Sequence, residues 1–122
     1  MHAIAALTLG IFLVIVGIAH FAAPAYFRSL VPSWLPGAAW LVVASGVAEL
    51  IVGGLLFAPA TRTAGAWAAA ALITGYLVSH VDALVHAAPD RRWLDRRPGA
   101  VARLVVNGGY IAWAVAVALT TS

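Results

Sequence analysis

The 122-residue chain is 64% hydrophobic, only 9% charged and free of cysteine, and its net charge of +3 comes from seven arginines without any lysine. Soluble domains carry about a quarter charged residues, so this composition excludes a water-soluble fold. Disulfides, thiolate nucleophiles and iron–sulfur clusters are excluded as well, and no aromatic residues interleave with the arginines in the pattern typical of nucleic-acid binding.

Four charge-poor runs are long enough to cross a bilayer, whose hydrocarbon core of ~30 Å requires about 20 apolar helical residues. These runs are residues 3–22, 38–58, 63–86 and 103–120. No arginine precedes the first run, so we expect a permanent span there and not a cleaved signal sequence. The sequence therefore predicts an all-α protein, an integral membrane four-helix bundle in which residues 1–122 form a single domain.

The connections between these spans differ in length and composition. Residues 23–37 contain three prolines among aromatic residues, which break helices and favour the headgroup level, so we expect an interfacial segment here. Residues 59–62 leave room only for an antiparallel hairpin. Residues 88–102 form a polar cap, in which four arginines are the predicted contacts for anionic lipid headgroups or for an acidic partner. These are Arg91, Arg92, Arg96 and Arg97.

The distribution of arginines predicts an orientation. Arg28 lies in the first connection, and Arg62 alone lies in the second. Five clustered arginines lie in or beside the third: Arg91, Arg92, Arg96, Arg97 and Arg103. Positively charged connections favour the cytoplasmic side of a membrane. We therefore expect both termini on the outer side.

Ionisable residues inside a span cost about 2.5 to 3.5 kcal/mol each on insertion scales, so each needs a reason. Glu49 lies near the middle of the second span. His20, His80 and Asn107 lie at span ends on the side of the arginine cap, and Tyr110 follows Asn107 by one turn. We expect these residues to line one polar cavity that opens toward the cap. Glu49 is then a ligand-binding or proton-carrying carboxylate, or it only holds helices together; the sequence favours neither alternative.

Asp82 and His86 are four residues apart in the third span, so both side chains can reach one metal ion. The pair belongs to no recognised ligand spacing, and terminal histidines often lie at the headgroups. A metal or haem therefore stays an open alternative. No cofactor is identified, although a quinone or a lipid is compatible with the apolar spans.

Two stripes of small residues predict close helix packing. The first stripe, on residues 3–22, consists of Gly10, Gly17 and His20. The second, on residues 63–86, consists of Ala64, Ala68 and Ala71.

Residues 17 to about 70 resemble the DoxX family of small bacterial four-helix membrane proteins. Three motifs carry the resemblance, and Pro59, Thr61 and Arg62 complete it: Gly17-x-x-His20-Phe21-x-x-Pro24, Val31-Pro32-x-x-Leu35-Pro36 and Ser45-Gly46-x-x-Glu49. The family commonly has an asparagine-containing segment near the end of the third span, where this chain reads VSHVDALVHA, so the resemblance assigns no role to His80 or Asp82. It implies a bundle in the bacterial cytoplasmic membrane, loosely associated with quinone-linked or thiol-linked redox systems and often accessory to another protein.

Three functions are compatible with these features. The leading hypothesis is an accessory or scaffolding subunit without catalytic activity, which contacts membrane lipids and either a protein partner or a second copy of itself. The alternatives are a membrane protein that binds a quinone, a lipid or another small molecule at Glu49, and a proton-coupled exporter. Since no hydrolase motif surrounds Ser45 or Ser79, we assign no catalytic residue.

Overall fold

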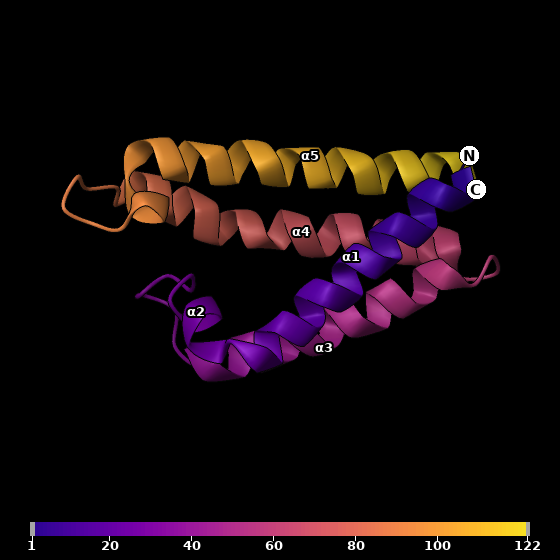
Figure 1. Ribbon diagram of the computed structural model, residues 1–122, viewed down its shortest axis with the longest axis horizontal. Coiled ribbons are helices and arrows are strands. Elements are labelled where there is room, and N and C mark those ends of the chain that lie inside the picture. The colour runs from indigo at the N-terminus through magenta and orange to yellow at the C-terminus, as the bar shows by residue number, and fades with distance from the viewer. Residues whose placement is uncertain (1, 122) are drawn as a thin grey trace.

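The computed structural model describes residues 2–121, which fold into four long helices and two short ones (Figure 1). The long helices are α1 (His2–Ala22), α3 (Ala38–Phe57), α4 (Arg62–Val85) and α5 (Arg97–Thr121), and the short ones are α2 (Pro24–Arg28) and the 3-10 helix η1 (Trp93–Asp95). No strand occurs between residues 2 and 121. All four long helices are apolar and long enough to cross a membrane. The predicted all-α, four-helix membrane fold is therefore confirmed, and the chain is a multi-pass membrane protein.

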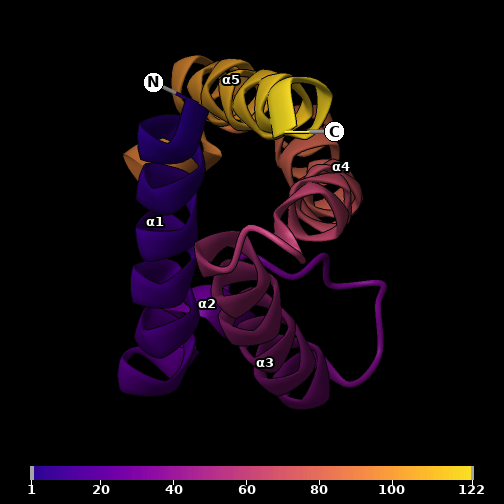
Figure 2. The same ribbon diagram turned by 90° about the vertical axis from the view of Figure 1, so that its right-hand side faces the viewer.

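The four long helices are arranged as two antiparallel pairs. α1 packs mainly against α3, and α4 packs mainly against α5. The pairs meet at the end where both termini lie and separate toward α2 (Figures 1 and 2). Large buried side chains such as Leu9, Leu56 and Val117 form the core at the closed end. Toward α2, where the pairs separate, this core does not fill the space between them.

Glycines bring α1 and α3 into close contact. Gly10 and Gly17 of α1 lie against Gly53 and Gly46 of α3, and a Cβ atom on Gly53 would lie 2.9 Å from Cγ2 of Val14 and 3.0 Å from the carbonyl oxygen of Gly10. Small residues allow two backbones to approach in this way. The predicted packing role of the glycine stripe on α1 is thus confirmed.

The alanine stripe predicted for the third span packs only in part, through Ala68, which is half-buried against the core. Ala64 and Ala71 are exposed, and the side of α4 that is buried within the chain carries a different set of small residues. This set consists of Gly65, Ala66, Ala69 and Ala70, and the larger Ile73 is buried on the same side. Because α4 has small residues on more than one side, their spacing alone does not select the side that packs.

We expect Gly53→Ala to lower the stability of the protein by about 1 kcal/mol, the low end of the range for added methyl groups in a packed core. The new Cβ meets the α1 backbone, so the two helices must move apart. Gly54→Ala is the matched control, since a Cβ on Gly54 has no neighbour within 4 Å. Thermal unfolding in detergent measures both, and equal midpoints for the two variants would contradict the proposed role of Gly53.

Helix ends differ from the sequence-based expectation at two places. α5 begins at Arg97 and not at residue 103, because Pro98 is tolerated in a first helical turn. The interfacial segment contains the short helix α2, whose first residue is Pro24. The interfacial segment ends at Gly37, whose φ of 73° lies in the left-handed region that favours glycine.

The hairpin between α3 and α4 agrees with its prediction, and side chains hold it together. Nε and Nη2 of Arg62 donate hydrogen bonds to the carbonyl oxygens of Leu56 at 3.0 Å and Phe57 at 3.1 Å. Oγ1 of Thr61 donates to the carbonyl oxygen of Leu55 at 2.7 Å. These bonds satisfy carbonyls that a helix end leaves without partners.

Candidate functional site

A cavity of about 520 Å³ lies between the two helix pairs. Its walls come from all four long helices and from the interfacial segment of residues 23–37, which contains α2 and is called the α2 segment below. The five residues that the sequence singled out all line it: His20, Glu49, His80, Asn107 and Tyr110. Most of the remaining lining is apolar or aromatic, as in Phe12, Leu30 and Val42. An apolar cavity with a few convergent polar groups is typical of small-molecule sites.

Glu49 is the most deeply buried polar residue of this lining, with 1% of its surface exposed. Its Oε1 atom accepts a hydrogen bond from the hydroxyl of Tyr76 at 2.7 Å. Its Oε2 atom lies 3.3 Å from Nδ1 of His20, but it has no hydrogen-bond partner among the described residues. A buried oxygen without a partner costs free energy and calls for an explanation, such as a bound proton or a ligand.

Two contacts hold the ring of His20 in its position next to Glu49. Nδ1 of His20 lies 2.8 Å from the carbonyl oxygen of Val16, one turn earlier in α1. Its ring stacks on the ring of Phe27 in α2, with centroids 3.9 Å apart and planes 18° apart. A hydrogen bond from Nδ1 to the Val16 oxygen explains why Oε2 of Glu49 stays unpaired.

A second polar cluster surrounds Arg103, which is only 8% exposed although the sequence counted it with the surface arginines. Its guanidinium donates to Nδ1 of His80 at 3.0 Å, to Oγ of Ser79 at 3.1 Å and to Oδ1 of Asp95 at 3.2 Å. Because Nδ1 of His80 accepts this bond, the ring carries its proton on Nε2. Nδ2 of Asn107 donates to the carbonyl oxygen of Arg103 at 2.7 Å. The cluster therefore ties α4, α5 and η1 together.

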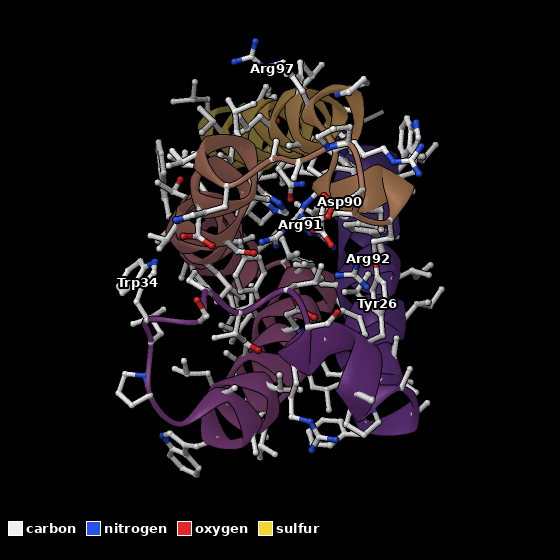
Figure 3. The ribbon with its side chains drawn as sticks, turned by 90° about the vertical axis from the view of Figure 1, so that its left-hand side faces the viewer. Tyr26, Trp34, Asp90, Arg91, Arg92 and Arg97 are labelled. Atoms are coloured by element: carbon white, nitrogen blue, oxygen red, sulfur yellow. The ribbon has the colours of Figure 1, made fainter. Side chains whose placement is uncertain are left out.

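Arg91, Arg92, Arg96 and Arg97 are all exposed at the end of the molecule that carries α2. In the view onto this end, Arg97 points away from the helices, while Arg92 lies beside Tyr26 (Figure 3). Arg92 is bound to its neighbours: Nε lies 2.6 Å from Oδ2 of Asp95, Nη2 donates to Oγ of Ser29 at 2.9 Å, and the guanidinium lies 5.9 Å from the Tyr26 ring centroid. Arg92 thus connects the polar cap to the segment that follows α2.

Asp82 and His86 lie outside the cavity lining. Oδ1 of Asp82 accepts a hydrogen bond from Nε1 of Trp34 at 2.8 Å and lies 3.1 Å from Nδ1 of His86. No third histidine, aspartate or glutamate joins them, and residues 2–121 contain no cluster of three such side chains that could hold a metal ion. Asp82 instead links the α2 segment to α4.

Sequence reasoning missed two residues that organise the site. Tyr76 is the hydrogen-bond partner of Glu49, and its position one turn before His80 was the available signal. Arg103 was counted as a surface charge because other arginines precede it closely in the sequence. Its apolar neighbours, Val101 and Leu104 among them, were the sign that it belongs to a helix inside the bundle.

The fold and the cavity define a small multi-pass α-helical membrane protein whose two helix pairs enclose a ligand-sized space with one deeply buried carboxyl group. Residues 9–118 match a family described as a domain of unknown function, DUF8561, and the chain therefore belongs to this family. No curated protein and no solved structure matches the chain.

Proposed function

We propose that this protein binds an amphipathic small molecule from the membrane in the cavity between its helix pairs, with Glu49 as the site for the ligand headgroup or for a proton. The observation that carries the proposal is the Oε2 atom of Glu49, which is buried at the cavity wall without a hydrogen-bond partner. A ligand headgroup with a hydrogen-bond donor supplies the missing partner. Quinols, lipids and other amphipathic molecules with such a headgroup fit this description.

The size and lining of the cavity support the same proposal. A volume of about 520 Å³ falls within the range of about 300 to 1,000 Å³ that is usual for small-molecule sites. The lining is mainly apolar, so a hydrocarbon chain or ring is buried there favourably. Its few polar groups orient the headgroup.

Filling the cavity tests the proposal. Gly75 lines the cavity, and a Cβ at this position has no neighbour within 4 Å, so Gly75→Leu places a side chain in open space. We expect wild-type protein, extracted in mild detergent, to carry one small molecule in stoichiometric amount, and we expect the Gly75→Leu variant to lose it. Native mass spectrometry followed by identification of the released compound measures both.

Gly54→Leu is the matched control for Gly75→Leu, since Gly54 is an exposed glycine with equally open surroundings and lies outside the cavity lining. This variant is expected to keep the ligand. Wild-type protein without any small molecule, or equal retention by both variants, would contradict the proposal. A stoichiometric protein partner in place of a small molecule would instead favour the accessory-subunit hypothesis.

We further infer an orientation and a cellular location. Both termini lie at one end of the helices and the arginine cap at the other, so the positive-inside rule favours termini on the outer side. The resemblance to the DoxX family supports the bacterial cytoplasmic membrane. A proton-coupled exporter requires the same Glu49 to bind proton and substrate in turn, and no observation favours this alternative over binding alone.

A further inference from the structure

We propose that the ligand of this cavity is a lipophilic amine, which binds as an ammonium ion and donates a hydrogen bond to Oε2 of Glu49. This inference rests on the proposed function and narrows it to one chemical class. Its basis is the distribution of charge around the cavity and the aromatic character of the lining.

Glu49 is the only acidic residue in the cavity lining, and no arginine takes part in it. The other carboxylates that lie near the cavity have partners. Asp95 lies 2.6 Å from Arg92 and 3.2 Å from Arg103, and Asp82 is bound to Trp34 and faces His86. Glu49 is therefore the one carboxylate of the cavity lining and has no arginine partner, although Nδ1 of His20 lies within ion-pair distance of its Oε2 atom, at 3.3 Å.

The Nδ1 atom of each histidine in the lining already has another partner. His80 accepts a hydrogen bond from Arg103 at Nδ1, which requires a neutral ring. His20 has its Nδ1 atom 2.8 Å from the Val16 oxygen, and although this atom is also 3.3 Å from Oε2 of Glu49, it forms no hydrogen bond there. Neither imidazole thus completes the hydrogen bonding of Glu49.

Aromatic rings surround the same space. The lining includes Phe12, Tyr76 and Tyr110, together with Tyr26 and Phe27, which already contact Arg92 and His20 with one face each. The rings of Phe12 and Tyr110 lie 4.7 Å apart between their centroids. Aromatic faces attract organic cations by cation–π interaction. A carboxylate that shares its cavity with several rings therefore favours an ammonium headgroup over a neutral hydroxyl and disfavours an anion.

The first test compares two probes of equal chain length, 1-dodecylamine and 1-dodecanol, with the protein in nanodiscs of zwitterionic phosphatidylcholine at neutral pH. Binding is measured for wild type and for Glu49→Gln, and the ratio of amine to alcohol affinity in one protein is divided by that in the other. This quotient cancels the different partitioning of the probes into lipid. We expect it to be about ten, because a hydrogen bond to a charged group exceeds a neutral one by about 1.4 kcal/mol.

The outcomes separate this inference from the proposed function. A quotient near one, with both probes lost in Gly75→Leu and kept in Gly54→Leu, overturns the amine and leaves cavity binding intact. Binding of both probes that is unchanged by Gly75→Leu overturns the proposed function as well. Dodecanoate serves as a third probe of the same chain length. Tighter binding of dodecanoate than of dodecylamine by the wild type also overturns the proposal of an amine ligand.

A second measurement needs no variant, because Glu49 is the only glutamate in the chain. Labelling the protein with ¹³C-glutamate therefore marks a single carboxyl group for difference infrared spectroscopy. We expect the labelled carboxylate band to be present when dodecylamine is bound. A labelled band of the protonated carboxyl group in the amine complex overturns the proposed ion pair.

Discussion

Replacing Gly99 by alanine is expected to lower the stability of the protein by about 3 kcal/mol, at the upper end of the usual effect of overpacking. Gly99 lies in the first turn of α5, against the backbone of η1. A Cβ atom at this position would lie 2.1 Å from the carbonyl oxygen of Trp93 and 2.9 Å from Cα of Leu94. Since both neighbours are backbone atoms, no side-chain rotation relieves the contact, and η1 must separate from α5.

Gly109→Ala is the control for Gly99→Ala. It makes the same substitution in the same helix, where the new Cβ has no neighbour within 4 Å. Alanine also favours a helix over glycine, so this variant is expected to be as stable as the wild type or slightly more stable. Thermal unfolding of both variants in one detergent gives the comparison. A Gly99→Ala midpoint equal to that of Gly109→Ala would show that η1 does not pack as described.

Arg103→Met is expected to destabilise the protein by about 2 kcal/mol. Methionine keeps much of the length of the side chain but leaves Asp95, His80 and Ser79 without their donor. Removing one member of a buried ion pair typically costs 3 to 5 kcal/mol. The smaller value applies here because the Asp95 side chain is 23% exposed and keeps Arg92 as a partner.

Arg97→Met provides the matched control, because Arg97 is exposed in the same helix and points away from the bundle (Figure 3). Surface substitutions of this kind usually change stability by less than about 0.5 kcal/mol. Chemical denaturation in mixed micelles compares the two variants with the wild type. Equal losses for Arg97→Met and Arg103→Met would contradict a specific role of the buried cluster.

The fold could be predicted from the sequence because a bilayer imposes one dominant constraint, the length of the apolar runs. The pairing of helices was less accessible. Gly10 and Gly17 indicated a packing surface correctly, since their stripe stands out in a helix of larger residues. Ala64 and Ala71 misled because α4 is rich in alanine all round. The start of α5 was placed too late because residues 97–102 were assigned to the polar cap, although they form the first turns of the helix.

The candidate site was predictable to the extent that depth in the membrane is readable from the sequence. His20, His80 and Asn107 lie on one side by their positions in the first, third and fourth spans, and the structure places all three on one cavity with Glu49. Tertiary contacts were not readable in the same way. The bond from Tyr76 to Glu49 joins α4 to α3, and the bond from Arg103 to His80 joins α5 to α4. Such bonds depend on helix rotation, which spacing along the chain does not specify.

The two helix pairs also differ in length. α1 and α3 have 21 and 20 residues, whereas α4 and α5 have 24 and 25. At 1.5 Å per residue the pairs are about 30 Å and about 37 Å long. A hydrocarbon core of about 30 Å matches the first pair and leaves about one turn of the second in the headgroup layer. α5 extends beyond α3 at the α2 end (Figure 1), and its first residue there is the exposed Arg97, so a charged residue begins the turn that lies in the polar layer and the mismatch costs little.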